Sequence, residues 1–340
     1  MSLVVPDDGV LVADGGLATE LEARGNDVSD SLWSARLLMD APDQIREAHV
    51  AFFRAGAVIA TSASYQASFE GFARRGIGRR DAAGLMRSSV GLARAAWAEV
   101  AGDGRTRWVA ASVGPYGAVL ADGSEYRGRY GLSVRELAAW HRPRIEVLAE
   151  AAPDVLALET VPDIDEAEAL MSAIAGVGIP VWLSYSIVGS RTCAGQPLPE
   201  AFAVAAGVPE VVAVGVNCCA PADVPAAIAV AREVTGKPVI AYPNSGEVWD
   251  AGRRAWTGQS LDFAGQLGQW VAAGARIAGG CCRVRPDDIT VMAQAAADLG
   301  QAPAGRTPIP RGLESPGPRK QARTERRFWT RAWGSQPRYP

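Results

Sequence analysis

Histidine and lysine are both scarce in this chain of 340 residues. The only histidines are His49 and His141, which argues against a metal site built from histidine and leaves few choices for a histidine general base. The only lysines are Lys237 and Lys320, and neither lies at the end of an expected strand, which argues against Schiff-base chemistry. A catalytic site in this protein therefore has to rely on other side chains.

Long apolar runs and a dense cysteine pattern are lacking as well. The longest apolar stretch, roughly residues 201–220, is interrupted by Pro209 and Glu210, which argues against a membrane-spanning helix. The N-terminal residues have neither the basic start nor the long apolar segment of a secretory signal. Five cysteines are far fewer than a secreted disulfide scaffold carries. We therefore expect a soluble, cytoplasmic protein with reduced thiols and no membrane partner.

The net charge of −3 conceals two parts of opposite charge. Residues 301–340 hold nine Lys and Arg against two Glu, a net of +7, which leaves −10 for residues 1–300. The same segment is rich in proline and arginine, a composition that rarely packs a core. We expect one domain over 1–300 and a basic, flexible tail over 301–340. Its charge run leaves open a tail that binds an acidic partner, although nucleic acid is not the partner we expect. The oligomeric state is not indicated.

Eight short apolar runs alternate with longer amphipathic stretches along residues 1–300. The apolar runs are 9–16, 57–64, 108–115, 155–161, 181–187, 211–218, 239–246 and 275–282. The stretches between them include 43–55, 80–100, 133–151, 163–175, 222–234, 260–273 and 286–299. Helix-start signals open three of these stretches: Ser133 with Glu136, Asp163 with Glu166, and Pro286 with two aspartates after it.

This alternation indicates parallel strands covered by helices, and eight units predict an α/β fold of the (β/α)8 TIM-barrel type. A doubly wound sheet is the competing architecture. It is disfavoured because no GxGxxG motif follows the first apolar run.

Polar and unusual residues gather at the end of each apolar run. Active sites of (β/α)8 barrels lie at the carboxyl ends of the strands, so these residues are expected to share one mouth. They include Asp14, Gly15, Ser64, Tyr65, Tyr116, Glu159, Thr160, Ser184, Tyr185, Asn217, Cys218, Cys219, Asn244, Gly279, Gly280, Cys281 and Cys282.

Four of the five cysteines form two adjacent pairs at these strand ends. Side chains alternate along a strand, so only one of Cys218 and Cys219 can face the barrel axis while the strand stays regular. Two glycines before Cys281 and Cys282 permit a bend that aims both cysteines at one point. Three converging thiolates suit a catalytic zinc site. The spacing matches no compact zinc motif, however, so cysteines buried merely as small apolar side chains remain an alternative.

Two further alternatives stay open at this point. One is a metal-independent lyase or aldolase that binds a phosphorylated substrate at Gly279 and Gly280. This alternative predicts a basic mouth, whereas the expected strand ends carry Asp14 and Glu159. The other is a non-enzymatic protein whose basic tail recruits an acidic partner.

Seven segments together resemble a known family, the homocysteine S-methyltransferases. They are DGGLATELEARG, TSASYQAS, SVGPYGAVLADGSEYRGRYG, LETVPDIDEAEAL, VGVNC, YPNSGEVWD and GGCCRVRPDDI. They run in order from Asp14 to about Ile289 and include none of the tail. VNC followed by GGCC is specific, whereas any one segment alone is weak.

The resemblance implies a Zn²⁺ ion held by Cys218, Cys281 and Cys282, with homocysteine as the methyl acceptor. Cys219 and the isolated Cys193 are then not ligands. The methyl donor implied is a sulfonium compound, S-methylmethionine or S-adenosylmethionine rather than betaine, and the product is methionine.

The resemblance also implies which residues bind the substrates. Asp14 and Glu159 would bind the amino group of homocysteine, with Ser64 and the backbone of Gly15 assisting. Asn217 and Asn244 would contact the substrate carboxylate or the thiolates. An aromatic face attracts a cation, so Tyr116 and Trp249 are candidates for the donor site, beside Tyr65, Tyr126 and Tyr185.

Overall fold

A ring of parallel strands forms the centre of the computed structural model, which describes residues 2–28, 32, 34–250, 255–258, 260 and 262–301. The strands of this sheet are β1 (Leu11–Val12), β2 (Ile59–Thr61), β3 (Trp108–Val113), β4 (Val155–Val161), β5 (Val181–Tyr185), β8 (Val211–Asn217), β9 (Val239–Tyr242) and β12 (Ala275–Ala278). Their order is β1-β12-β9-β8-β5-β4-β3-β2, and a parallel bridge between Ala13 and Ile59 closes the ring. The predicted (β/α)8 barrel is confirmed.

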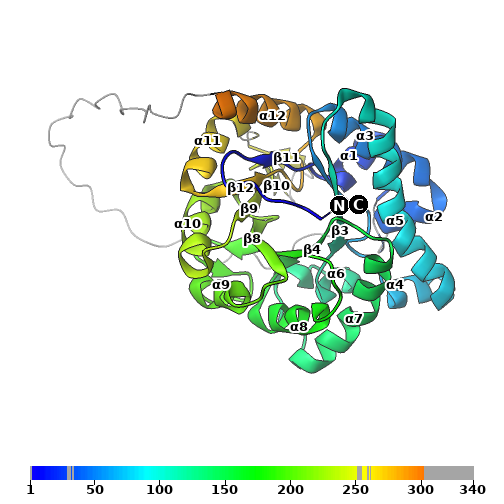
Figure 1. Ribbon diagram of the computed structural model, residues 1–340. Helices are drawn as coiled ribbons and strands as arrows, with labels where there is room; N and C mark the ends of the chain where they lie inside the picture. Colours follow the sequence, from blue (N-terminus) through cyan, green and yellow to red (C-terminus); the bar gives the residue numbers. More distant parts are fainter. Residues whose placement is uncertain are drawn as a thin grey trace, which may run out of the picture.

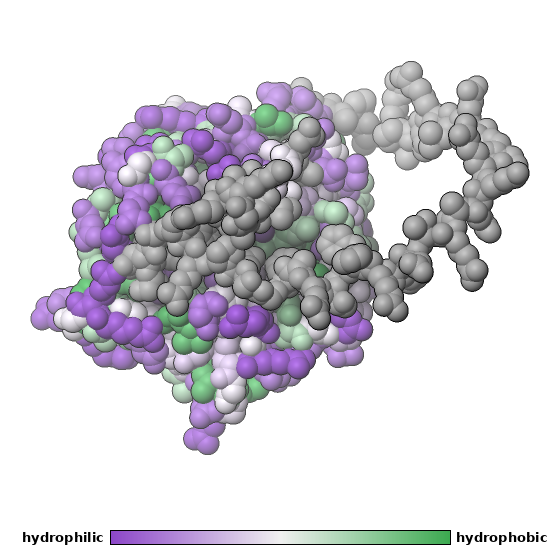
Figure 2. Space-filling model, turned by 180° about the vertical axis from the view of Figure 1, so that it is seen from behind, coloured by the Kyte–Doolittle hydropathy of each residue, from purple (hydrophilic) through white to green (hydrophobic). Residues whose placement is uncertain are grey.

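Helices surround this barrel on all sides (Figure 1). They are α1 (Leu17–Ala23), α2 (Ser34–Asp40), α3 (Pro42–Arg54), α4 (Phe69–Ala73), α5 (Arg79–Val100), α6 (Tyr116–Leu120), α7 (Val134–Glu150), α8 (Ile164–Ile174), α9 (Leu198–Ala206), α10 (Val224–Thr235), α11 (Phe263–Ala273) and α12 (Pro286–Gln301). The helices present polar residues outwards, so the face seen in Figure 2 is largely hydrophilic where residues are coloured. Among the described residues, no helix combines the length and apolar character needed to span a bilayer.

Short elements fill the loops between strands and helices. Two antiparallel ribbons pair β6 (Ile187–Val188) with β7 (Arg191–Thr192) and β10 (Val248–Asp250) with β11 (Ala255–Thr257). The 3-10 helices are η1 (Ala101–Asp103), η2 (Ser124–Tyr126) and η3 (Pro221–Asp223). Of the predicted tail, only Gln301 belongs to a described element, and residues 302–340 lie outside the described residues.

The predicted helix-start signals act as caps. Ser133 accepts a hydrogen bond from the Glu136 backbone N–H, and the Glu136 carboxylate accepts one from the Ser133 N–H, so both orphan donors are satisfied. Asp163 accepts from the Glu166 N–H at 2.8 Å and caps α8. α12 begins at Pro286, whose missing N–H costs nothing in a first helical turn.

The barrel strands separate two apolar layers. On β5, Val181, Leu183 and Tyr185 pack in the layer under the helices, whereas Trp182 points into the barrel interior. The Trp182 indole N–H donates to the Tyr242 hydroxyl at 3.0 Å within this interior layer. Small residues such as Ala110, Ala157 and Ala213 share the interior and leave space for these two rings. Because side chains fill the barrel interior, we expect the groups that bind a ligand to lie at the ends of the strands.

Candidate active site

Strand β8 delivers Cys218 to the carboxyl end of the barrel. The strand ends at Asn217, and Cys218 has a positive φ of 49°, so the chain leaves the regular strand at this residue. The Cys218 N–H donates to the Tyr242 carbonyl oxygen at 3.1 Å, which ties the turn to the end of β9. The prediction that only one of Cys218 and Cys219 faces the barrel axis assumed a regular strand, and the strand is not regular here. Cys219 nevertheless lies apart from Cys218, in the apolar layer under the helices.

Strand β12 delivers the second cysteine pair through a tight turn. The Gly280 N–H donates to the Asp14 carbonyl oxygen at 3.0 Å, and the Val284 N–H donates to the Cys281 carbonyl oxygen at 3.1 Å. A Cβ at Gly280 would lie only 2.2 Å from Cγ1 of Val284, so the turn requires glycine. The bend predicted at the glycines is therefore present, and it aims Cys281 and Cys282 at Cys218.

The sulfur atoms of Cys218, Cys281 and Cys282 all lie within 4.8 Å of one another, and those of Cys218 and Cys282 are 3.7 Å apart. A tetrahedral zinc ion with Zn–S bonds of about 2.3 Å holds its sulfur ligands about 3.8 Å apart. The residues present therefore fit zinc in chemistry and in spacing. In the part of the chain that the structure describes, no other trio of Cys, His, Asp or Glu side chains gathers in this way.

Hydrogen bonds among the three thiols shift their pKa values in opposite directions. The pKa of Cys282 is held well below that of an ordinary thiol because the Cys218 and Cys281 side chains hydrogen-bond to its sulfur. The pKa of Cys281 is raised, because its hydrogen bonds with the other two thiols and its burial favour the protonated form. Cys282 is thus the thiol that ionises first, while Cys218 and Cys281 keep their protons beside it.

Tyr126 adds a hydroxyl to the cluster. Its oxygen lies 3.0 Å from the Cys218 sulfur. Burial, followed by the charges of Cys218 and Cys282, raises the pKa of Tyr126 well above its usual value. The phenol therefore keeps its proton and can donate it in a hydrogen bond to a Cys218 thiolate.

Asp14 and Glu159 form a pair of buried carboxyl groups, 4% and 7% exposed. Asp14 accepts from the Thr61 N–H at 2.7 Å and from the Thr61 hydroxyl at 3.0 Å, and Glu159 accepts from the Ser112 hydroxyl. Burial raises the pKa of Asp14 to about 8, with a further contribution from the charge of Glu159, and burial raises that of Glu159 to about 7. The pair therefore favours a cation beside it, which would compensate both charges.

Tyr65 and Tyr242 are buried tyrosines on which both Glu159 and the cysteines act. Burial raises the pKa of Tyr65, and the charges of Cys218 and Glu159 both add to the shift. The pKa of Tyr242 is raised in the same way by burial, by Glu159 and by Cys281. The two tyrosines thus lie close to both groups, which places the acids and the sulfurs in one site.

Asn217 braces the backbone beside Glu159. Its side-chain oxygen accepts from the Thr160 N–H and from the Ser184 hydroxyl, each at 2.8 Å, and its amide donates to the Thr160 hydroxyl at 2.7 Å. Thr160 has a φ of 60°, a conformation that a β-branched residue adopts only when its surroundings impose it. Sequence reasoning missed this role, because the two residues are 57 positions apart.

Ser64 and Gly15 occupy tightly packed positions. The Ser64 hydroxyl donates to the Ser112 carbonyl oxygen at 2.7 Å and lies 2.8 Å from the Ser62 hydroxyl. A Cβ at Gly15 would lie 2.6 Å from the Val284 carbonyl oxygen, so the loop after β1 packs directly on the cysteine turn.

Asn244 supports the cysteine turn from the end of β9. Its side-chain oxygen accepts from the Cys282 N–H at 3.1 Å, and its own N–H donates to the Cys219 carbonyl oxygen at 3.0 Å. This residue therefore links the two cysteine pairs through their backbones.

The aromatic candidates divide into two groups. Tyr65 and Tyr126 border the cysteines, as described above. The Tyr116 ring instead packs against Trp140 and Tyr130, at centroid distances of 5.0 and 5.2 Å, and the Tyr185 hydroxyl donates to the Ala201 carbonyl oxygen under helix α9. Trp249 belongs to β10, and its side chain lies outside the described residues.

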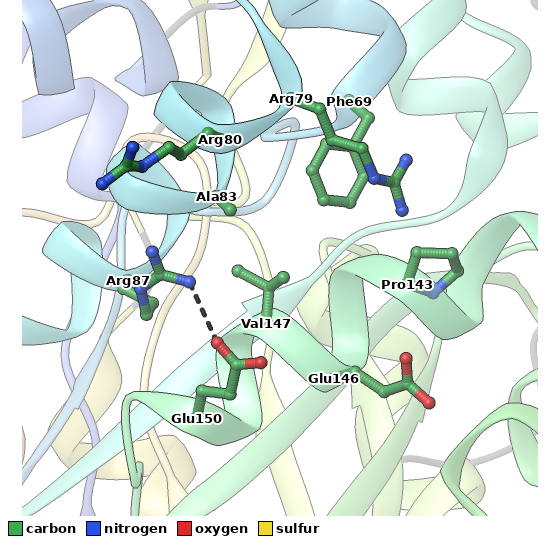
Figure 3. A pocket seen from close by; sticks show the side chains of 9 residues that line it. All are labelled: Phe69, Arg79, Arg80, Ala83, Arg87, Pro143, Glu146, Val147 and Glu150. Carbon is green, nitrogen blue, oxygen red and sulfur yellow. Dashed lines mark hydrogen bonds and ion pairs between the residues drawn. The ribbon is translucent and has the colours of Figure 1, made fainter.

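A separate hollow lies between helices α5 and α7, away from the strand ends. Two of the arginines that line it contact other lining residues: Arg87 pairs with Glu150 at 2.9 Å (Figure 3), and the Arg79 guanidinium lies 3.9 Å from the Phe69 ring centroid. The hollow shares no residue with the cysteine and carboxyl site.

Known proteins resemble this chain over nearly all of the barrel. The family model of the homocysteine S-methyltransferases matches residues 11–296. The homocysteine S-methyltransferase of Escherichia coli (strain K12) is 45% identical over 291 residues, which cover 83% of this chain and 94% of that protein. Homocysteine S-methyltransferase 4 of Zea mays is 45% identical over 306 residues, with 84% and 89% covered.

Solved structures agree with this assignment. The Escherichia coli homocysteine methyltransferase MmuM in its metallated form superposes with a TM-score of 0.77 at 43% identity, covering 85% of this chain and 96% of that one. The chain therefore belongs to the homocysteine S-methyltransferase family.

Proposed function

We propose that this protein transfers a methyl group from S-methylmethionine, or from S-adenosylmethionine, to the thiol of homocysteine in a zinc-dependent reaction that yields methionine. The observation that carries the proposal is the convergence of three cysteine sulfurs beside two buried carboxyl groups. Membership of the family, together with relatives named homocysteine S-methyltransferase, supports homocysteine as the acceptor.

Cys218, Cys281 and Cys282 would hold the zinc ion. Their spacing fits its tetrahedral sulfur coordination, and the Escherichia coli relative was solved in a metallated form. A bound zinc would keep the homocysteine sulfur as thiolate at neutral pH, and thiolate is the nucleophile. The Asn244 side chain fixes the Cys282 backbone, and the Tyr126 hydroxyl hydrogen-bonds the Cys218 sulfur, so groups outside the cluster help to orient two of the three cysteines.

Asp14 and Glu159 would bind the ammonium group of homocysteine. Each is already oriented by a hydroxyl donor, and burial raises the pKa of both carboxyl groups, so an ammonium group beside them would stabilise their charged forms. Ser64 and the Gly15 backbone would assist in binding this ammonium group. Asn217 and Asn244 complete the proposed binding set around the acceptor.

The chemical step needs no proton transfer. The homocysteine sulfur attacks the donor methyl carbon, the new C–S bond forms, and the sulfonium C–S bond breaks with its electron pair staying on the departing sulfur. The nucleophile loses its negative charge and the donor loses its positive charge, so the atoms and charges balance. Aromatic side chains, with Tyr116 and Trp249 among the candidates, would contact the donor cation.

The thiol chemistry suits a reducing compartment. All five cysteines are free, although the sulfurs of Cys218 and Cys282 lie close together. We therefore propose a cytoplasmic location, where thiols stay reduced.

A side-by-side turnover assay tests the proposed function. Purified, zinc-loaded protein is incubated with homocysteine and with S-methylmethionine, S-adenosylmethionine or betaine. We expect methionine from the sulfonium donors and none from betaine. No methionine with any donor would overturn the proposal, and turnover with betaine alone would overturn the donor class.

A further inference from the structure

Glu125 is a buried carboxyl group for which the proposed binding of homocysteine has no use. It lies in η2 (Ser124–Tyr126), and the residue is 5% exposed. Its Oε2 atom has no hydrogen-bond partner. A buried polar atom is nearly always paired in folded proteins, so an unpaired carboxyl oxygen at this depth calls for a partner that binds from outside.

The position of Glu125 connects it to the cysteine cluster. The next residue, Tyr126, places its hydroxyl 3.0 Å from the Cys218 sulfur. Burial raises the pKa of Glu125 to about 7, and the charges of Asp122, Arg127 and Cys282 act on it as well. The charge of Glu125 adds in turn to the burial that raises the pKa of Tyr65 and of Tyr126. Glu125 therefore belongs to the segment that contacts the cysteine cluster, where the methyl donor must meet the homocysteine sulfur.

The local packing holds Glu125 in this place. A Cβ at Gly117 would lie 2.4 Å from the Glu125 backbone nitrogen, so helix α6 and η2 meet backbone to backbone. The basic residue that follows in the chain, Arg127, points to the surface and pairs with Asp122 at 3.4 Å. Glu125 is thus held in place by this backbone contact, and its buried Oε2 atom is left without a hydrogen-bond partner.

The reaction itself decides which cation this carboxyl group can usefully bind. The sulfonium charge is partly lost in the transition state, so a carboxylate at the sulfonium would stabilise the donor more than the transition state and slow the transfer. The α-ammonium group of an amino-acid donor keeps its charge throughout. The ammonium group of homocysteine is already assigned to Asp14 and Glu159.

We propose that Glu125 binds the α-ammonium group of the methyl donor and so selects amino-acid sulfonium compounds. This inference rests on the proposed function, because it names a residue of the donor subsite of the same reaction. Glu125 is a binding residue here, and takes no part in making or breaking bonds.

Steady-state kinetics of Glu125→Gln test this inference. The amide keeps the shape and removes the charge. We expect the KM for S-methylmethionine to rise about tenfold, since a charge-assisted hydrogen bond is lost, while kcat and the KM for homocysteine stay within about twofold. Calorimetry adds a direct readout: binding of S-methylmethionine should weaken, whereas binding of dimethylsulfoniopropionate, a sulfonium compound without an ammonium group, should not change.

Glu22→Gln is the matched control. Glu22 is exposed, yet its charge also acts near Cys282, so the substitution removes the same charge from the same neighbourhood. An unchanged donor KM in Glu125→Gln, or an equal rise in Glu22→Gln, would overturn the inference. If Glu125→Gln does not fold, Glu125→Asp, which shortens the reach of the carboxylate, is expected to raise the same KM. A wild-type protein that transfers no methyl group would instead overturn the proposed function itself.

Discussion

At the scale of single residues, the site depends on groups whose charge the protein alone does not balance. Asp14 and Glu159 are buried without a compensating cation, and the thiols of Cys218, Cys281 and Cys282 share their protons. Such groups lower stability and are retained where a ligand completes them. The unliganded site is therefore strained electrostatically, and its ligands are expected to relieve that strain.

The first prediction concerns Asp14 and pH. Its pKa rises from 3.8 to about 8 on folding, so the folded protein keeps a proton that the unfolded chain releases above about pH 4. The stability that the folded protein gains from keeping Asp14 protonated is therefore fully present below about pH 4. It is lost as the pH rises towards 8, so the free energy of unfolding falls over this range. Asparagine does not ionise, so Asp14→Asn avoids this loss of stability. In unliganded protein, the difference in Tm between the variant and wild type should therefore shift in favour of the variant from pH 6 to pH 8.5. A Tm difference that stays constant over this range would contradict the raised pKa.

The second prediction concerns Asn217. Asn217→Ala removes three hydrogen bonds and leaves the buried Thr160 N–H without its partner. We expect the free energy of unfolding to fall by roughly 1–3 kcal/mol, measured by urea denaturation, together with a higher KM for homocysteine, because Thr160 adjoins Glu159. Ser184→Ala removes only one of the three bonds and should cost less. Equal losses in the two variants would contradict the bracing role.

At the scale of elements, the loops after the strands meet by close backbone contact. The turn after β12 packs on the loop after β1, and η2 packs on α6. These contacts leave no space for side chains at Gly280 and Gly117. They fix the positions of the cysteine turn and of Glu125 through direct contact between backbones.

The third prediction concerns the contact between α6 and η2. Gly117→Ala would force a Cβ to within 2.4 Å of the Glu125 nitrogen, so the two elements must separate. We expect a loss of about 1–3 kcal/mol in urea denaturation and a higher KM for the methyl donor. Gly91→Ala in the middle of α5 meets nothing within 4 Å and should be neutral or stabilising. A Gly117→Ala variant as stable as Gly91→Ala would contradict the packing described.

Much of this organisation could be predicted from the sequence, because strands and caps depend on neighbouring residues. The eight apolar runs coincide with the eight barrel strands, and the Ser133 box and the Asp163 cap lie where the pattern indicated. The sequence also predicted that the two cysteine pairs lie close together, because the parallel strands of a barrel end at one mouth.

The supporting contacts could not be predicted in this way. The bonds between Asn217 and Thr160 join strands 57 positions apart, and the left-handed φ of Cys218 breaks the alternation on which the argument about Cys219 depended. The burial of Glu125 depends on how two short elements pack, and no periodicity reports that. Such features are tertiary, and one sequence carries no local signal for them.

At the scale of the whole molecule, every residue assigned a role in the proposed reaction lies within residues 14–282. Residues 302–340, with their excess of positive charge, lie beyond the end of α12. The site is formed by the strand ends of residues 14–282, and the family model matches 11–296. We therefore predict that methyl transfer does not require the tail.

The fourth prediction follows from that arrangement. A chain truncated after Gln301 should keep kcat and both KM values within about twofold of the full chain, measured with homocysteine and S-methylmethionine. Loss of methyl transfer on truncation, with the fold intact by circular dichroism, would favour the alternative in which the tail is the functional segment.

The most direct test of the central claim is the zinc content of purified protein and of its cysteine variants. We predict one equivalent of zinc in the wild type and in Cys219→Ser, whose side chain lies in the apolar layer. Cys218→Ser, Cys281→Ser and Cys282→Ser should each lose most of the metal, because each removes one of three converging sulfurs. One equivalent retained in all three of these variants, or zinc lost equally from Cys219→Ser, would contradict the account.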